Sequence, residues 1–115
     1  MSFFRKNKII NYQKKEIERI ERNLKKLSNG DFDIDLEVSE GSSCVQTERN
    51  QFIKLNQYIL KIKETFNGFV EDTEKLSNNI KEGNLEYRID TTRYSGIYSK
   101  IGKDINTSIE VISKP

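Results

Sequence analysis

The sequence predicts an all-α protein in which two helix–connector–helix units follow one another and share a long middle helix. Two copies of the chain are expected to form a parallel four-helix coiled-coil bundle, a homodimer. Three observations lead to this fold. Apolar residues recur at alternating spacings of three and four, a glycine-led segment occurs twice, and the 20 basic and 18 acidic residues are interleaved over most of the chain.

The composition favours amphipathic helices over a disordered chain. Hydrophobic residues make up 34% and charged residues 33%, yet the net charge is only +2. Disorder usually combines low hydrophobicity with a high net charge. Interleaved charge also disfavours a nucleic-acid binder. We interpret the most basic stretch, residues 5–15, as a solvated helix start, with contact to phosphate or lipid headgroups as the alternative.

The residues offer no candidate for catalysis or metal binding. The chain has no histidine and a single cysteine, Cys44, so neither a histidine-activated nucleophile nor an ordinary zinc site can be assembled. The alternating acids that begin at Asp31 fail the calcium-loop pattern, because Leu36 and Ser42 stand where glycine and glutamate are needed. We therefore expect no catalytic residue, no metal, no cofactor and no small-molecule substrate.

The location is expected to be cytoplasmic. The sequence has no run of 18 or more apolar residues and no secretory signal, since Arg5, Lys6 and Lys8 follow directly after Phe3 and Phe4. A single cysteine also suits a reducing compartment.

The first helix is expected over residues 6–28. Its apolar residues keep the a and d spacing of a heptad, with Gln13 as a polar exception. The Asn29-Gly30 pair is typical of a helix C-terminus. The residues expected to face the bundle are Ile17, Ile20, Leu24 and Leu27.

The middle helix, over residues 47–82, carries the strongest heptad pattern. Steps of three and four from Phe52 meet an apolar residue at eight of nine positions, Thr73 being the exception. Gly83 is expected to end the helix. The seam positions are Phe52, Leu55, Ile59, Ile62, Phe66, Phe69, Thr73, Leu76 and Ile80.

The third helix is expected over residues 98–114, just before Pro115. Its seam residues are Ile101, Ile105 and Ile112.

Two connectors, residues 29–46 and 83–97, belong to an internal repeat. Residues 27–37 align without gaps to residues 80–90, and the Leu55-Asn56 pair of the next helix recurs as Ile105-Asn106. This organisation gives a first unit at residues 6–68 and a second at 69–115, with the middle helix divided into 47–68 and 69–82.

A connector with regularly spaced apolar residues can run back along its helices, so that both helices of a unit point the same way. The alternative is a loose loop with incidental apolar residues. The residues expected to hold the two connectors are Gly30, Phe32, Ile34 and Leu36, and Gly83, Leu85, Tyr87 and Ile89.

The dimer is expected because two helices are too few to enclose a core. Outside its seam the middle helix also carries Ile53, Tyr58 and Leu60, a wider apolar surface than a two-stranded coiled coil needs. A second copy would supply two more helices.

These features together resemble HAMP domains, the linker modules of bacterial chemoreceptors and sensor kinases. The matching segments are residues 27–32 and 80–88 together with the Leu55-Asn56 and Ile105-Asn106 pairs, and residues 84–115 look particularly like the corresponding part of methyl-accepting chemotaxis proteins. Neither first helix contains the proline common in the family.

The resemblance implies a signal relay in which helix packing alternates between two arrangements. It also implies an output domain that lies outside this chain and contacts a chemotaxis kinase and a coupling protein, in receptor arrays at the membrane.

Two other functions remain open. A plain oligomerisation coiled coil explains the heptads but not the repeated connectors. A ligand-sensing bundle would use Tyr58, Phe66 and Phe69 to line a pocket.

Overall fold

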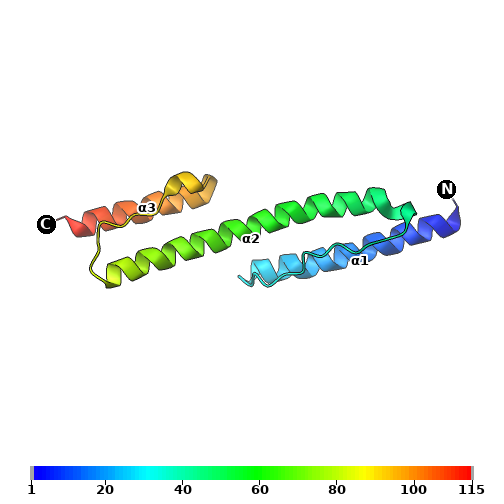
Figure 1. Cartoon of the computed structure of the whole chain (residues 1–115), viewed down its shortest axis with the longest axis horizontal. Coiled ribbons are helices and arrows are strands. Elements are labelled where there is room, and N and C mark those ends of the chain that lie inside the picture. The colour runs from blue at the N-terminus through cyan, green and yellow to red at the C-terminus, as the bar shows by residue number, and fades with distance from the viewer. Residues whose placement is uncertain (1, 115) are drawn as a thin grey trace. The chain divides into compact units, whose positions relative to one another are not determined.

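The structure, a computed structural model, describes residues 2–114 and contains three long helices and no β-strand in that range (Figure 1). Helix α1 spans Phe3–Ser28, α2 spans Gln46–Lys81 and α3 spans Gly96–Ser113. Two 3-10 helices precede α2 and α3, namely η1 at Ser43–Val45 and η2 at Thr91–Arg93. The all-α class is confirmed. The expected role of Pro115 lies outside the described residues.

The helix starts differ from the predicted ones. Helix α1 begins at Phe3 rather than at residue 6, because the Ser2 hydroxyl accepts a hydrogen bond of 3.2 Å from the Arg5 amide and caps the helix there. Helix α3 begins at Gly96 rather than at residue 98. Helix α2 is continuous from Gln46 to Lys81.

Two glycines end the helices as expected. Gly30 and Gly83 have φ angles of 76° and 86°, in the left-handed region. After α1, the Gly30 amide donates to the Leu27 carbonyl and the Asp31 amide to the Lys26 carbonyl. The same two bonds follow α2, from the amides of residues 83 and 84 to the carbonyls of residues 80 and 79. Both helices therefore end in a Schellman motif.

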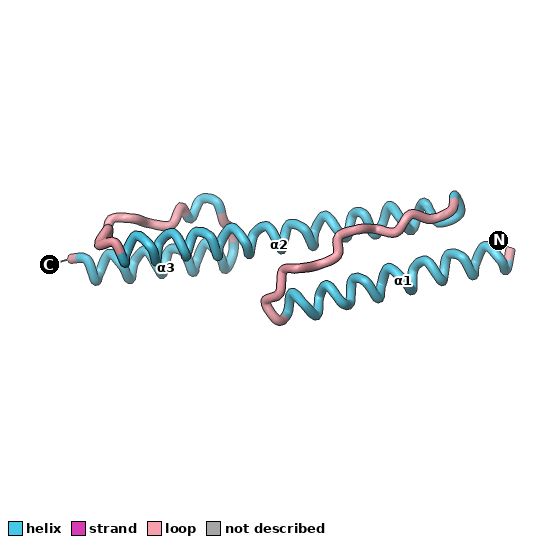
Figure 2. Tube along the Cα trace, turned by 60° about the horizontal axis from the view of Figure 1, so that its bottom comes forward, coloured by secondary structure: helices cyan, strands magenta, loops and turns pink. Residues whose placement is uncertain are grey.

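The chain divides into two compact units, with unit 1 ending at Lys63 and unit 2 beginning at Glu64. Our sequence prediction placed this division between residues 68 and 69. In unit 1, α1 and the first part of α2 run in the same direction, and the connector runs back along them (Figures 1 and 2). Unit 2 repeats this arrangement with the last part of α2, its own connector and α3.

Each unit has a small apolar core of its own. In unit 1 the buried apolar residues are Tyr12, Val45, Phe52 and Ile59, with the Tyr12 and Phe52 rings edge to face at 6.1 Å. In unit 2 they are Leu76, Ile89 and Ile109. Four buried apolar residues in unit 1 and three in unit 2 form small cores for more than fifty residues each, so each unit leaves much of its apolar surface uncovered.

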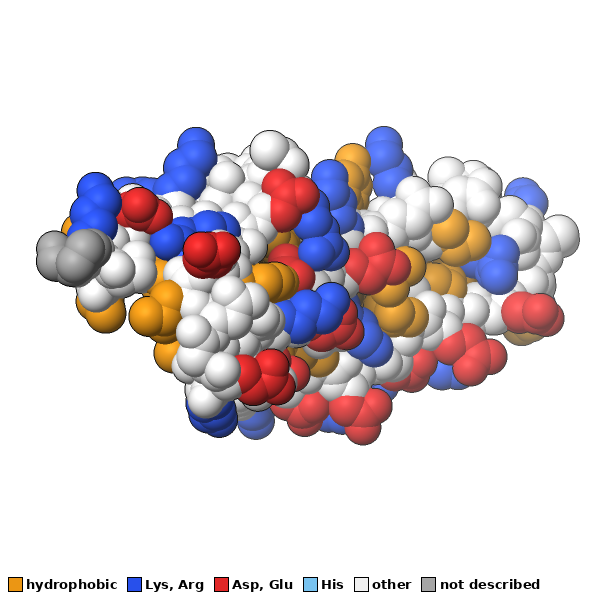
Figure 3. Space-filling view, turned by 60° about the vertical axis from the view of Figure 1, so that its left-hand side comes forward, with side chains coloured by type: hydrophobic (Ala, Val, Ile, Leu, Met, Phe, Trp, Pro, Cys, Tyr) orange, Lys and Arg blue, Asp and Glu red, His pale blue; other side chains and the backbone are white. Residues whose placement is uncertain are grey.

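The predicted seam residues divide into three groups by exposure. Phe52, Ile59 and Leu76 are buried within their own chain. Ile20, Leu27, Phe69, Thr73 and Ile105 are half-buried. Ile17, Leu24, Leu55, Ile62, Phe66, Ile80, Ile101 and Ile112 are exposed. Apolar side chains thus reach the surface between charges of both signs (Figure 3).

Substituting alanine for Gly30 or Gly83 should destabilise the protein by about 1 kcal/mol each, because a β-carbon disfavours the left-handed conformation. A new β-carbon at either site has no heavy atom within 4 Å, so the cost comes from the backbone alone. Urea denaturation at fixed protein concentration measures it. Gly30→Asn is the matched control and should cost less, since asparagine tolerates this conformation. Equal losses for alanine and asparagine would contradict the backbone explanation.

Candidate functional site: side chains that hold the connectors

The first connector is an extended segment without a strand partner. Phe32, Ile34 and Leu36 are half-buried while Asp33 and Asp35 between them are exposed, which is the expected alternation. In the second connector burial increases along the chain: Leu85 is 37% exposed, Tyr87 is half-buried and Ile89 is 3% exposed. Such a backbone must find its hydrogen bonds outside any sheet.

Asn23 of α1 supplies two of these bonds. Its Nδ2 donates to the Asp35 carbonyl at 2.7 Å, and its Oδ1 accepts from the Asp35 amide at 2.9 Å. Asn23 is 2% exposed, so both bonds are shielded from water. The asparagine amide thus pairs with one connector residue as a neighbouring strand would. We call this pairing an asparagine clasp.

A buried ion pair extends the contact along the connector. Glu16 and Arg19 lie one helical turn apart on α1, and the Arg19 Nε is 2.6 Å from the Glu16 Oε2. The other Glu16 oxygen accepts from the Ser39 amide at 2.5 Å, and the Arg19 Nη1 donates to the Asp35 carbonyl at 2.9 Å. Both charges are therefore used to bind connector backbone, which offsets part of the cost of burying them.

Tyr12 holds the far end of the same stretch. Its hydroxyl donates to the Ser39 carbonyl at 2.6 Å. Burial, and then the nearby Glu16 carboxylate, raise the pKa of Tyr12, so the donating form of the hydroxyl is favoured.

The two asparagines of the repeated sequence pairs take equivalent positions. The Asn56 Nδ2 of α2 donates to the Leu36 carbonyl, and the Asn106 Nδ2 of α3 donates to the Ile89 carbonyl at 2.9 Å. Leu36 and Ile89 are themselves equivalent in the gapless alignment. The repeat therefore preserves a side-chain contact to the connector backbone.

The remaining oxygen of each asparagine has a different partner. The Asn106 Oδ1 accepts from the Ile89 amide at 2.9 Å, which completes a clasp like that of Asn23. The Asn56 Oδ1 instead accepts from the Arg19 Nη1 at 2.9 Å. In unit 2 the clasp is therefore formed by Asn106 of the second helix, whereas in unit 1 it is formed by Asn23 of the first helix, α1. Asn56 instead links α2 to α1 through its hydrogen bond with Arg19.

Asp72 is the charged centre of unit 2. Its carboxylate accepts from the Arg93 Nη1 at 3.0 and 3.1 Å and from the Tyr94 hydroxyl. Burial, the hydrogen bond to Asp72 and its negative charge raise the pKa of Tyr94 to about 12. At the other end of this connector, the Arg88 Nη2 donates to Glu110 of α3 at 2.7 Å.

Aromatic rings complete the packing of unit 2. Phe69 lies 5.3 Å from the Tyr94 ring and 5.6 Å from the Tyr98 ring, and Phe66 lies 5.4 Å from Tyr98, mostly in edge-to-face geometry. These distances are those of packed aromatic pairs. Phe66 and Phe69 therefore contact their neighbours' rings, while Tyr58 in unit 1 is 60% exposed.

Equivalent positions carry opposite charges in the two units. Arg19 and Asp72 are 53 residues apart, the offset that also relates the two connectors. Each is a charged residue of the first helix of its unit and binds the connector of that unit. Unit 1 surrounds this position with Glu16 and Asn23, whereas unit 2 has Phe69 and Leu76 at the same places. The connector is held mainly by polar contacts in unit 1 and more by apolar packing in unit 2.

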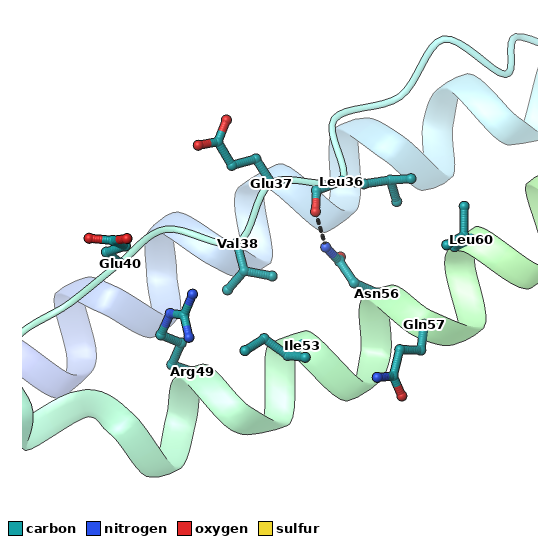
Figure 4. A pocket seen from close by; sticks show the side chains of 9 residues that line it. All are labelled: Leu36, Glu37, Val38, Glu40, Arg49, Ile53, Asn56, Gln57 and Leu60. Atoms are coloured by element: carbon teal, nitrogen blue, oxygen red, sulfur yellow. Dashed lines mark hydrogen bonds between the residues drawn. The ribbon is translucent and has the colours of Figure 1, made fainter.

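An open groove of about 430 Å³ lies between the first connector and α2 (Figure 4). Leu36, Val38, Ile53 and Leu60 supply its apolar lining, and Arg49 lies at one end of it. The Arg49 Nε is buried and has no hydrogen-bond partner among the described residues.

The sequence prediction missed Tyr12, Glu16, Arg19 and Asn23. Their spacings of four, three and four place them on one face of α1. This spacing is the signal in the sequence that these residues share a face. It does not predict a buried face, because polar residues at helical spacing usually mark a face exposed to solvent. The sequence prediction named connector residues but not their polar partners on the helices.

Within residues 2–114 no cluster of metal-ligating side chains occurs, and none of the helices there combines the length and apolar character needed to cross a membrane. Comparison of the chain with protein-family models, curated proteins and solved structures gave no match.

Removing a clasp should weaken the fold strongly. Asn23→Ala leaves the Asp35 amide without its partner and Asn106→Ala does the same to buried Ile89, so we expect losses of about 2–4 kcal/mol for either variant. Urea denaturation provides the measurement. Asn78→Ala, at an exposed position of α2, is the control and should stay within about 0.5 kcal/mol of the parent. Clasp variants as stable as this control would show that the bonds contribute nothing.

Tyr94 should ionise only near pH 12 in the folded protein, against about 10 in the unfolded chain. Because its folded pKa is raised, its contribution to stability is complete below pH 10 and is lost as the pH rises towards 12. The phenolate absorbance difference between the parent and Tyr94→Phe follows this one group. Asp72→Asn should move the transition to lower pH by removing the negative charge. A parent transition at pH 10 would contradict the assignment.

Proposed function

We propose that this chain is a HAMP-type signal-relay module that works as a parallel homodimer in the cytoplasm. The observation that carries the proposal is the repeated contact between a helix asparagine and a connector carbonyl, Asn56 to Leu36 and Asn106 to Ile89. A coiled coil with no other role needs neither the connectors nor these contacts. Two copies of one parallel-helix unit along the chain suit a device that passes a packing change from unit to unit.

The exposed apolar stripes support the dimer. On α1, Ile10, Ile17 and Leu24 follow one another at intervals of seven and are 57%, 48% and 50% exposed. On α2, Leu55 and Ile62 keep the same interval at 46% and 42%. Covering half-exposed side chains of this size contributes about 1 kcal/mol each. A second copy in parallel orientation brings equal stripes together and can also cover the groove beside Ile53.

The relay itself depends on α2. This helix is the second helix of unit 1 and the first helix of unit 2. A rotation or shift of its first part therefore acts on the second connector through residues such as Asp72, which binds Arg93 and Tyr94. The buried polar residues of unit 1 keep its packed state only moderately favoured, and a small energy gap is what a two-state element requires.

In a longer receptor, α3 would pass the change to an output domain that engages a chemotaxis kinase and a coupling protein. The input would act on α1. This context follows from the resemblance of residues 84–115 to chemotaxis receptors.

Disulfide cross-linking tests the parallel dimer. In a Cys44→Ser background, Leu24→Cys and Ile62→Cys should each link to the same position of a second copy, because both lie on the exposed stripes. Arg22→Cys, on a different face of α1, is the matched control and should link far less. Sedimentation equilibrium checks the mass. A monomer that gives no links at 24 and 62 contradicts the proposal.

The relay is tested by perturbing unit 1 and observing unit 2. A spin label at Ile101→Cys, again with Cys44→Ser, reports the distance between the copies in unit 2. Asn23→Ala should change that distance distribution, whereas Lys25→Ala at an exposed site of α1 should leave it unchanged. If Asn23→Ala leaves the distance between the two spin labels unchanged, the dimer is a plain oligomerisation coiled coil.

A further inference from the structure

The first turn of α1 presents two phenylalanines to solvent. Phe3 is 80% exposed and Phe4 is 69% exposed. Two adjacent aromatic side chains that are this exposed indicate a binding surface, because burial of each ring would be strongly favourable.

The proposed dimer accounts for Phe3 but not for Phe4. Phe3 precedes Ile10 by seven residues and so continues the exposed stripe of α1. Phe4 lies 18 residues before Arg22, which is five helical turns, so these two share a different face of the helix. A second copy seated on the stripe therefore leaves the Phe4 ring uncovered.

The sequence that follows these rings carries only positive charge up to residue 15. Five of the chain's 20 basic residues lie between residues 2 and 15, and the first acid is Glu16. The other 15 basic residues share the rest of the chain with all 18 acids, so the excess positive charge is concentrated here. Lys8 lies beside Phe4, with its Nζ 4.8 Å from the ring centroid. The basic residues are Arg5, Lys6, Lys8, Lys14 and Lys15.

We propose that the segment 3–15 of α1 binds the surface of an anionic phospholipid bilayer. The Phe4 ring enters the boundary between headgroups and acyl chains, while Arg5 and Lys8 pair with lipid phosphates. Exposed aromatic rings beside basic residues on a helix match a surface that is negatively charged outside and apolar beneath. Such a surface needs no shape complementarity, and this convex helix turn offers none. A nucleic acid would use the basic residues but would leave Phe4 without an apolar environment.

Tryptophan fluorescence tests insertion directly, since the chain has no tryptophan of its own. Phe4→Trp should shift its emission to shorter wavelength on vesicles of phosphatidylcholine with about a third phosphatidylglycerol, because the ring leaves water. Tyr58→Trp, at an exposed position of α2, is the control and should keep its emission unchanged. An unchanged Phe4→Trp spectrum overturns the proposal.

Vesicle co-sedimentation separates the two contributions. Phe4→Ala, and the pair Arg5→Gln with Lys8→Gln, should each lower the affinity about tenfold, and added salt should weaken binding. The pair Lys54→Gln with Lys61→Gln removes equal charge from exposed sites on α2 and should have little effect. Circular dichroism confirms that all variants remain folded. Binding to pure phosphatidylcholine equal to that on the anionic vesicles contradicts the proposal, as does nucleic-acid binding that is stronger and independent of Phe4.

Discussion

An extended backbone without a neighbouring strand is the constraint on which each unit depends. Its amides and carbonyls must be satisfied, and α1, α2 and α3 supply side chains that do so. In unit 1, Asn23 forms hydrogen bonds with both backbone groups of Asp35, and Glu16 accepts a hydrogen bond from the Ser39 amide. In unit 2, Asn106 pairs with both groups of Ile89. Because the connector is fixed along the helices, it returns the chain to the end of the unit at which the first helix began. The two helices of a unit then run in the same direction, which is the arrangement that the proposed parallel dimer requires.

The same constraint is met with different chemistry in the two units. Unit 1 uses a buried ion pair and Asn23, and it places Arg19 in contact with both the connector and Asn56. Unit 2 has Leu76 buried where unit 1 has Asn23, and it binds its connector through Asp72 and packed aromatic rings. Buried ionic groups carry a desolvation cost that apolar packing does not. Unit 1 should therefore release its connector more readily, and the direction of the proposed relay, from unit 1 to unit 2, agrees with this difference.

Much of this fold could be predicted from the sequence because its signals are periodic or local. Heptads gave the helices, and the pairs that contain Gly30 and Gly83 gave their ends, since only a left-handed residue closes a Schellman motif cheaply. The start of α1 was misplaced because Ser2 caps it from a position that carries no periodic signal. The clasp was not predicted, although the repeated Asn56 and Asn106 pointed to it. Tertiary contacts decide which polar residue of a helix faces a connector. The residues next to Asn23 in the sequence carry no motif that marks it as such a residue.

Amide hydrogen exchange tests the central claim most directly, because it observes the connector backbone itself. If side chains replace a strand partner, the amides of Asp35, Ser39 and Ile89 exchange far more slowly than those of an unstructured peptide, at rates comparable to amides within α2. These three amides donate to Asn23, Glu16 and Asn106. Exchange at the rate of a free peptide while α2 stays protected would contradict this claim, because it would show that the connectors are loose loops that the helix side chains do not hold.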